Sequence, residues 1–428
     1  MPFACAASSL NIYCIMKQHP TGPERSDSWL NRRRFLSHTG TAALALSLAS
    51  PSRVVCGENR KQVTLGLIGC GGRGKWIADL FNKHGGYRIA AVADYFPDQA
   101  DAAGNRFQVP ENRRYTGLNG YKQLLEAKPD AVAIESPPFF HPEQAAAAVS
   151  AGCHVYLAKP VAVDVPGSLS VEQSGIRAGK NKLVFLVDFQ TRTQPLLKDF
   201  AARIAQGEIG RIASAEAAYQ TGPVGEGVDR ARRADPNNPE LRLRAWVTDR
   251  ALSGDIITEQ NIHAIDLACW MLNAAPLKAW GRGGKCRDFV GNCWDNFSLI
   301  FEYPEGVHLT FSSKQVGFGF EDIMCRVYGT LGTVDAHYFG KVTFKSKEDF
   351  AAGDVGDVYR SGAESNIATF HDSIMTGNFT NLTVATSVRS NLASILGRTA
   401  AYRQEIVTWD SIVNHAEPLV ADLTGLKA

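Results

Sequence analysis

The chain has 428 residues, of which 45% are hydrophobic and 21% are charged, and this composition is typical of a globular protein. The length is sufficient for two domains or more. A formal net charge of +2 creates no overall field that would attract nucleic acid or an anionic membrane surface, and no apolar run in the sequence reaches the ~20 residues that a membrane-spanning helix needs.

The first residues of the chain predict an export signal. Residues 31–37 read Asn-Arg-Arg-Arg-Phe-Leu-Ser, and a short apolar stretch at 41–49 ends in small residues, which is the order of parts in a secretory signal. Arg32 and Arg33, followed by Phe and Leu, resemble the twin-arginine signal of proteins that are exported after folding. We therefore expect a twin-arginine signal and disordered leader at 1–55 and a periplasmic or other extracytoplasmic location. The alternative is a basic tail that only resembles a signal.

Residues 63–94 predict the first half of a dinucleotide-binding fold. The apolar, β-branched run 63–68 is typical of a buried parallel strand, and 75–83 has the apolar spacing of a helix. Between them lies the turn Gly69-Cys70-Gly71-Gly72-Arg73-Gly74. A strand, a glycine turn and a helix in this order present free backbone N–H groups to the phosphates of a nucleotide.

The glycines of this turn and an acid after the second strand indicate which nucleotide is bound. Gly69 permits the tight turn, Gly71 lets a pyrophosphate approach the backbone, and Gly74 lets helix and strand pack closely. The second strand, 87–93, is followed by Asp94, whose carboxylate can accept hydrogen bonds from ribose hydroxyls and would repel a 2′-phosphate. We therefore expect NAD rather than NADP. A glycine-rich turn without a ligand is the alternative.

Strands and helices continue to alternate up to about residue 188. Apolar runs at 131–134, 154–157 and 183–187 are separated by stretches of helical character. This alternation predicts an α/β fold with a doubly wound parallel sheet, a Rossmann domain at 61–188 that binds ligands at the carboxyl ends of its strands. The residues expected to bind the cofactor are Gly69, Gly71, Arg73, Gly74, Asp94, Ser136, Pro137 and Lys159.

In the second half of the chain the apolar pattern changes to the period-two alternation of antiparallel strands. It occurs at 212–219, 297–303 and 307–313, and a Pro-Glu-Gly turn joins the last two. We expect residues 189–428 to form an α+β domain with an open, mainly antiparallel sheet, which binds substrate and offers its free face to a second copy of the chain. The polar segment 221–250 is expected to be a long loop near the cleft.

The nine cysteines contain no Cys-x-x-Cys pair, so the spacing of a zinc site is absent and no metal is expected. Buried free thiols are the simplest interpretation of most of them. Cys286 and Cys293 could pair in an oxidising compartment, although their spacing does not establish it.

Four segments carry a resemblance to a known family: GLIGCGGRG at 66–74, AVAIESPPFFHPEQAAAA at 131–148, GCHVYLAKP at 152–160 and SGDIITEQNIHAIDLACW at 253–270. They are similar to the Gfo/Idh/MocA oxidoreductases, which include glucose–fructose oxidoreductase and inositol dehydrogenase. The resemblance extends from about residue 63 to the C-terminus, and its later part looks like a secreted branch of that family.

Two of these segments imply which residues are catalytic. The third is close to the family's Glu-Lys-Pro motif, which implies that Lys159 lies beside the nicotinamide and the substrate. The fourth resembles the motif Asp-x-x-x-His-x-x-Asp, which implies roles for Glu259, His263 and Asp266. Two positions depart from the pattern. Ala158 replaces the usual Glu, so an ion pair that fixes the lysine through that residue is missing, and Glu259 stands where inositol dehydrogenase has Asp.

The chemistry of alcohol oxidation assigns a task to each of these side chains. His263 can accept the hydroxyl proton, because histidine titrates near neutral pH. Lys159, with its pKa lowered near a positively charged nicotinamide, can hydrogen-bond the same oxygen. Glu259 would orient His263 or bind a neighbouring sugar hydroxyl, and the spacing places Glu259, His263 and Asp266 on one face if the segment is helical. The residues considered for substrate contact, with a structural role as the alternative, are Gln190, Arg192, Asp266 and Tyr359.

Together these features predict a periplasmic, NAD-dependent sugar or polyol oxidoreductase that acts on CH–OH groups. Because little free NAD is expected outside the cytoplasm, the cofactor should be loaded before export, held tightly and regenerated in place. Its expected partners are a sugar, the twin-arginine export machinery and a second copy of the chain. A glycoside hydrolase or lyase that works by transient oxidation at C3 is the alternative enzyme, and a sugar-binding protein with a structural nucleotide is the third hypothesis.

Overall fold

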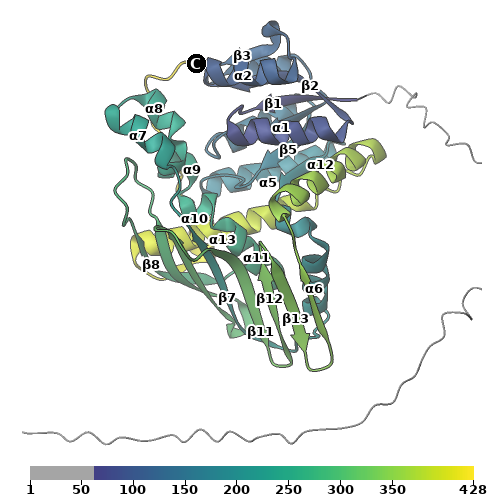
Figure 1. Cartoon of the computed structure of the whole chain (residues 1–428), viewed down its shortest axis with the longest axis vertical. Coiled ribbons are helices and arrows are strands. Elements are labelled where there is room, and N and C mark those ends of the chain that lie inside the picture. The colour runs from purple at the N-terminus through teal and green to yellow at the C-terminus, as the bar shows by residue number, and fades with distance from the viewer. Residues whose placement is uncertain (1–61) are drawn as a thin grey trace, which may run out of the picture. The chain divides into compact units, whose positions relative to one another are not determined.

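A computed structural model describes residues 62–428, which form two sheets with helices around and between them (Figure 1). The expected signal at 31–37 and the leader at 1–55 lie outside the described residues. Within 62–428, no helix has both the length and the apolar character that crossing a membrane requires.

The first sheet has six strands, all parallel, in the order β3-β2-β1-β4-β5-β6. The predicted doubly wound sheet is thereby confirmed. The strand order reverses between β1 and β4, so a crevice opens there at the carboxyl ends of the strands. Its elements are β1 (Val63–Ile68), α1 (Gly72–His84), β2 (Tyr87–Asp94), α2 (Pro97–Phe107), β3 (Arg114–Thr116), α3 (Gly120–Glu126), β4 (Ala131–Ile134), α4 (His141–Ser150), β5 (His154–Ala158), α5 (Val165–Lys180) and β6 (Phe185–Asp188).

The second sheet has nine strands in the order β14-β13-β12-β11-β7-β10-β9-β8-β15. Only β7 and β10 pair in parallel, so the sheet is mainly antiparallel, as predicted. The strands are β7 (Ile212–Thr221), β8 (Lys278–Gly284), β9 (Asn296–Glu302), β10 (His308–Gln315), β11 (Asp322–Gly329), β12 (Gly332–His337), β13 (Lys341–Ser346), β14 (Phe350–Asp354) and β15 (Val407–Thr408).

Nine α-helices come after the first sheet in the described part of the chain. They are α6 (Pro195–Ala205), α7 (Glu226–Ala234), α8 (Pro239–Arg244), α9 (Arg250–Ser253), α10 (Ile256–Glu259), α11 (Ile262–Met271), α12 (Val358–Thr376), α13 (Thr383–Arg403) and α14 (Trp409–Asn414). The segment 221–250 was expected to be a loop, but it contains α7 and α8. Asn238 explains the start of α8, because its Oδ1 accepts hydrogen bonds from Glu240 N and Leu241 N at 3.0 and 3.1 Å.

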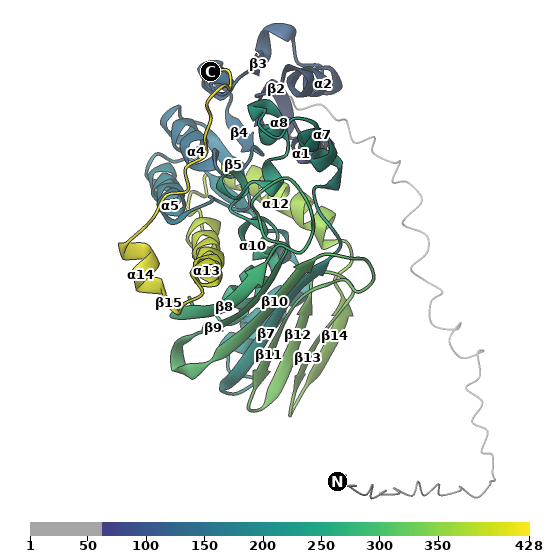
Figure 2. The same ribbon diagram turned by 90° about the vertical axis from the view of Figure 1, so that its left-hand side faces the viewer.

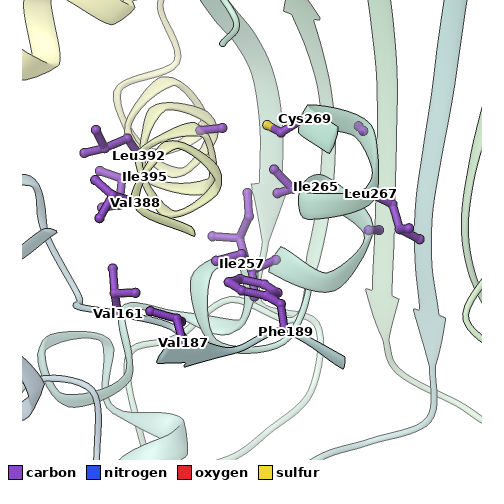
Figure 3. Packing of buried hydrophobic residues seen from close by; sticks show 14 of the residues in the cluster. Val161, Val187, Phe189, Ile257, Ile265, Leu267, Cys269, Val388, Leu392 and Ile395 are labelled. Carbon is purple, nitrogen blue, oxygen red and sulfur yellow. The ribbon is translucent and has the colours of Figure 1, made fainter. Parts of the chain in front are cut away.

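Helices α11 and α13 cover one face of the second sheet, and their apolar side chains meet the end of the first sheet. Figure 3 shows Val388, Leu392 and Ile395 on the side of α13 that is turned away from Ile265 of α11, with Val161 and Val187 of the first half of the chain below α13. Burial of such side chains contributes about 1.5–3 kcal/mol each, so this shared core joins the two sheets firmly.

Helix α12 lies against the first sheet although it directly follows β14 of the second sheet in sequence (Figure 1). Its Phe370 ring lies 5.7 Å from the ring of Tyr156 in β5 and 6.5 Å from that of Phe81 in α1. The first sheet ends at Asp188 and the second begins at Ile212, yet residues 60–428 form one compact unit. The division into domains at 188 and 189 stays a prediction.

Candidate active site

A cavity of about 390 Å³ lies at the switch point of the first sheet. Residues of the glycine turn, of the ends of β2 and β4, and of α4 line it, together with a few from the second half of the chain. Of the residues expected to bind the cofactor, those that line this cavity are Gly69, Gly71, Asp94, Ser136 and Pro137. The sequence-based expectation and the cavity therefore coincide at five positions.

The glycine turn has the geometry that a pyrophosphate requires. Gly69 has a φ of +91°, and a Cβ there would lie 2.5 Å from Ser136 N. A Cβ on Gly74 would lie 1.9 Å from the carbonyl oxygen of Gly69, so α1 can approach β1 this closely only with glycine. A Cβ on Gly71, by contrast, would meet nothing within 4 Å, because that side of the backbone is open. These positions fit a dinucleotide bound at the start of α1.

Asp94 is held in place by two backbone donors. Its Oδ2 accepts a hydrogen bond from Cys70 N at 2.7 Å, and its Oδ1 accepts one from Phe96 N at 2.9 Å. Burial raises the pKa of Asp94, while these two N–H groups act in the opposite direction. Each carboxylate oxygen can accept a further bond, so the side chain is fixed but can still receive ribose hydroxyls.

Arg73 was expected to bind the cofactor, but its guanidinium is engaged elsewhere. Its Nε lies 3.0 Å from Glu135 Oε2, and one terminal nitrogen lies 2.6 Å from Asp188 Oδ2. The other terminal nitrogen of Arg73 donates to the Tyr359 hydroxyl at 2.9 Å. The Tyr359 ring stacks on the Trp76 ring, and their centroids are 4.6 Å apart. Arg73 is absent from the residues that line the cavity. Arg73 thus bridges two carboxylates, and its contact with the cofactor stays a prediction.

Lys159 follows β5 and meets Glu259 at the end of α10. Its Nζ donates to the backbone carbonyl of Glu259 and lies 3.2 Å from Oε1 of the same residue. The two side chains are only 9% and 13% exposed. Burial lowers the pKa of Lys159, and the Glu259 carboxylate opposes this effect. Glu259 thus provides the ion pair that Ala158 cannot form.

The segment that carries Glu259 and His263 is not one helix, so the expected common face is wrong. Helix α10 ends at Glu259 and α11 begins at Ile262. Asn261 N reaches back to the carbonyl of Ile256, which closes α10 with a wider turn before α11 starts. As a result Glu259 points to Lys159 and forms no hydrogen bond with His263.

The His263 ring is buried between aromatic side chains near Lys159. It is 7% exposed, and its centroid lies 5.1 Å from that of Tyr338 and 6.4 Å from that of Phe189. Its Nδ1 is buried without a hydrogen-bond partner. Burial, reinforced by the charges of Lys159 and Arg73, lowers its pKa well below 6.5. His263 is therefore neutral at pH 7, which is the state that a general base requires.

Three of the residues considered for substrate contact have structural roles instead. Arg192 Nε donates to Asp266 Oδ2 at 3.0 Å, and a second nitrogen bonds to the other carboxylate oxygen and to the carbonyl of Thr386. Gln190 is fully buried and donates to Asp188 at 2.9 Å. These contacts favour the structural alternative for Arg192, Asp266 and Gln190. Tyr359 is 41% exposed and lies beside Arg73, as described above.

Sequence analysis missed Glu135 and Asp188, the two carboxylates that share Arg73. Both side chains have no exposed surface. Glu135 lines the cavity at the end of β4. The sequence contains an indication of Glu135, because an acidic residue directly after the apolar run 131–134 is unusual. Their common partner in α1 was not visible from spacing.

Helix α4 begins at His141. Its ring nitrogens lie 2.8 Å from the carbonyl oxygens of Ser136 and Pro160, so it connects the segments that follow β4 and β5. Burial lowers the pKa of His141 to about 4. The His141 side chain therefore stabilises the two segments that carry Ser136 and Pro160.

Residues of the second half of the chain cover the cavity near Asp94. Figure 2 shows α7 and α8 beside α2 and the carboxyl ends of the first sheet. From this segment, Leu243, Arg244 and Trp246 line the cavity. Arg244 lies 2.6 Å from Asp98 of α2, and its guanidinium carbon lies 3.7 Å above the Phe96 ring. Segments far apart in sequence thus contact one another at the edge of the cavity.

The C-terminal tail adds to this cover. Leu118 N donates to the carbonyl of Lys427 at 3.0 Å, and Lys427 N donates to the Tyr95 hydroxyl at 3.1 Å. The same hydroxyl donates to Glu240 of α8 at 3.0 Å. Tyr95 therefore connects the tail and α8 directly behind Asp94.

Cys286 and Cys293 are both free thiols, so the possible disulfide between them is not present. Cys286 is exposed and Cys293 is buried beside Ser253. Among residues 62–428, no group of three or more His, Cys, Asp or Glu side chains is arranged to hold a metal ion.

Two family models match the chain. Residues 63–181 match the oxidoreductase family with an NAD-binding Rossmann fold, and residues 198–335 match the GFO/IDH/MocA C-terminal domain. Together the two ranges cover more than half of the chain.

Individual relatives are more distant. Inositol 2-dehydrogenase 2 of Saccharopolyspora erythraea is 28% identical over 282 residues, which cover 64% of this chain and 73% of the relative. An aldose-aldose oxidoreductase from Caulobacter crescentus, solved with glycerol, has a TM-score of 0.65 at 17% identity over 81% of this chain and 100% of its own. A scyllo-inositol dehydrogenase from Lactobacillus casei, solved with NAD(H) and scyllo-inositol, has a TM-score of 0.63 at 18% identity, with 82% and 100% covered. At these identities the two structures establish similarity of fold.

Proposed function

The chain belongs to the GFO/IDH/MocA family of oxidoreductases, and from that premise we propose that it oxidises a secondary hydroxyl group of a sugar or polyol with bound NAD. The family assignment confirms the predicted oxidoreductase class and NAD as the cofactor. The names of its relatives, inositol dehydrogenases and an aldose oxidoreductase, support a polyol or sugar as substrate. The observation that carries the proposal is the contact of Lys159 with Glu259, close to a neutral His263.

The residues present fit the cofactor, because a Cβ would block the turn at Gly69 and Gly74 while the side of Gly71 is open. Bound NAD supplies the hydride acceptor. Asp94, fixed by two backbone N–H groups, receives the adenosine ribose and disfavours a 2′-phosphate. Arg244, in the same cavity, does not reverse this preference, because its charge is paired with Asp98.

Lys159 and His263 share the work at the substrate hydroxyl. The ammonium group of Lys159 has three N–H donors. Two of them donate to the carbonyl oxygen and the carboxylate of Glu259, so the third can donate to the substrate oxygen. His263, neutral and without a hydrogen bond to any described residue, accepts the hydroxyl proton at a ring nitrogen. Glu259 acts as a positioning residue for Lys159. The low exposure of all three side chains excludes water and strengthens these interactions.

We further propose that the protein is exported by the twin-arginine route and that NAD is loaded before export and then retained. The sequence at 31–37 supports the route, since that pathway carries folded proteins. The contacts at the edge of the cavity support retention, because the Arg244–Asp98 pair and the bond from Leu118 to Lys427 join segments of both halves of the chain around it. The retained cofactor is then reoxidised in place by a second sugar or ketone.

The free face of the second sheet supports the proposal of a homo-oligomer. A hollow of about 340 Å³ on this sheet is lined by Trp280, Ile300 and Met324 among others, while α11 and α13 cover the opposite face. Apolar side chains on an open sheet are typical of a subunit interface. Light scattering of the protein and of a Trp280→Asp, Ile300→Asp variant tests this: a multimer should dissociate in the variant, and a monomeric parent protein contradicts the proposal.

Identification of the retained nucleotide tests the main proposal. Mass spectrometry of protein purified from its exported fraction should find NAD close to one per chain. Sugars and polyols added singly should then produce the absorbance of bound NADH. Protein that carries no nucleotide contradicts retention. Release of an aglycone from aryl glycosides without any external oxidant would favour the glycoside hydrolase or lyase alternative instead.

A further inference from the structure

Two buried carboxylates share one guanidinium beside the cofactor cavity. Glu135 directly follows β4, and Asp188 is the last residue of β6, with β5 between these two strands. Arg73 of α1 bridges the two carboxylates at 3.0 and 2.6 Å. Neither carboxylate has exposed surface. One cation therefore faces two potential anions in a site without solvent.

Strand register places Glu135 next to the catalytic lysine. Ile134 of β4 pairs with Leu157 of β5, so Glu135 comes opposite Ala158, and Lys159 is the next residue. Glu135 also lines the cofactor cavity, beside Gly69 and Ser136. The carboxylate that is absent at position 158 is thus present one strand away.

The two carboxylates differ in how well their negative charge is stabilised. Asp188 accepts hydrogen bonds from Arg73, from Gln190 Nε2 at 2.9 Å and from Asn366 Nδ2 at 2.8 Å. Glu135 accepts no well-aligned hydrogen bond at either oxygen, although Arg73 Nε lies 3.0 Å away. An anion without hydrogen bonds in a buried site is the one that takes up a proton most readily.

Among the titratable groups that surround the Arg73 guanidinium, Glu135 is the one whose pKa lies near neutrality. Burial is the main cause that raises the pKa of Glu135, to about 7; Asp188 raises it further, while Arg73 and Lys159 lower it. The Tyr156 hydroxyl has a pKa well above 10, because it is buried near these carboxylates, and it stays neutral.

The count of charges depends on the redox state of the cofactor. Glu135, Asp188 and Glu259 give three negative charges against the two positive charges of Arg73 and Lys159, while His141 and His263 are neutral. A positive nicotinamide ring bound beside Lys159 would balance the remaining charge. The ring of NADH is neutral, so reduction would leave one uncompensated negative charge in a buried site, and this is costly.

We propose that Glu135 takes up one proton when the bound NAD is reduced and releases it when the cofactor is reoxidised. The inference rests on the proposed dehydrogenase function. In the reduction, the C–H and O–H bonds of the alcohol break and the C=O bond forms. The hydride goes to NAD⁺, and the hydroxyl proton, which His263 accepts first and then gives up, resides finally on a Glu135 oxygen. The reaction of alcohol, NAD⁺ and carboxylate to ketone, NADH and carboxylic acid releases no proton to solvent. A resident cofactor then stores both the hydride and the proton that the second substrate needs.

Infrared difference spectroscopy tests this without any sugar. The NAD-loaded protein at about pH 7 is reduced chemically with dithionite, and the reduced-minus-oxidised spectrum is recorded in H₂O and D₂O. We expect a positive C=O band of a protonated carboxyl group that shifts in D₂O. It should be absent in Glu135→Gln, shifted in Glu135→Asp, and unchanged in Glu143→Gln, whose carboxyl group is exposed.

The outcomes separate this inference from the proposed function. No carboxyl band in the parent protein, or a band that persists in Glu135→Gln, overturns the role of Glu135. If Glu135→Gln does not retain NAD, the parent protein and Glu135→Asp still decide, because only a Glu135 origin predicts a shifted band in the latter. Failure of every sugar to reduce the bound NAD would instead contradict the dehydrogenase function and leave the infrared result unaffected.

Discussion

The ammonium group of Lys159 is held by Glu259, which comes from a segment 100 residues further along the chain. Lys159 follows a strand of the first sheet, and Glu259 ends a short helix beside the second, so the pair forms only when the two halves are packed together. The catalytic lysine thus depends on contact between them.

Glu259 should control the pH range of activity through Lys159. Its carboxylate opposes the effect of burial on the pKa of Lys159, so Glu259→Gln lowers that pKa further. Protonated Lys159 is needed to donate to the substrate oxygen, and the alkaline limb of kcat/KM should therefore move to lower pH. Glu259→Asp should restore part of the shift. An unchanged pH profile in Glu259→Gln would show that the carboxylate has no influence on the lysine.

His263→Gln should lower kcat by about 10²- to 10⁴-fold, the usual contribution of a general base. Because the pKa of His263 is lowered well below 6.5, the neutral base persists at lower pH than for an ordinary histidine. The activity of the parent protein should therefore stay level through pH 6.5 and decline only below it. Steady-state rates across pH check both points, and an acidic limb centred at 6.5 would contradict the assignment.

The buried pair of Arg192 and Asp266 should matter for stability rather than for chemistry. Arg192→Met leaves Asp266 as a buried charge without its partner, which costs about 3–5 kcal/mol. The double variant Arg192→Met, Asp266→Leu should lose less than the single one. Urea unfolding measures the difference, and the activity of the folded fraction should be unchanged. A large loss of kcat with normal stability would return Arg192 to the substrate site.

Arg244→Ala should release NAD faster. The variant loses the ion pair with Asp98 and the contact with the Phe96 ring, which together contribute enough for about a tenfold faster dissociation. Arg230→Ala, in the exposed part of the neighbouring helix α7, is the matched control and should not differ from the parent protein. Displacement of bound NAD by labelled NAD provides the rates. Equal rates in all three proteins would mean that the cover does not limit release.

The glycine turn and Asp94 lie where the sequence places them, at the first strand, helix and second strand of the sheet, because their geometry is local. Gly69, Gly71 and Gly74 lie within six residues of one another, and the reason for each is visible in the backbone. Asp94 likewise receives its hydrogen bonds from the turn and from two residues further on. When the partners of a residue are close to it in sequence, the spacing of residues along the chain is sufficient to predict its place in the fold.

The errors arose where partners are distant in sequence. The break between Glu259 and His263 depends on how α10 closes, and an apolar helical pattern continues across it. The bridge from Arg73 to Glu135 and Asp188 joins three elements, and Arg192 meets Asp266 across 74 residues. Spacing along the chain contains no record of such pairs, so residues in the correct region received the wrong roles.

In the proposed reaction, bound NAD accepts a hydride from a sugar or polyol with the help of Lys159. The most direct measurement is a single turnover: protein that retains NAD is mixed with an excess of the reducing polyol, and the absorbance of NADH is followed in the parent protein and in Lys159→Met. We expect rapid formation of NADH on the parent protein, and a rate about 10²- to 10³-fold lower in Lys159→Met with the same amount of bound NAD. Equal rates in the two proteins, or no NADH on the parent protein with any sugar or polyol, would contradict the account.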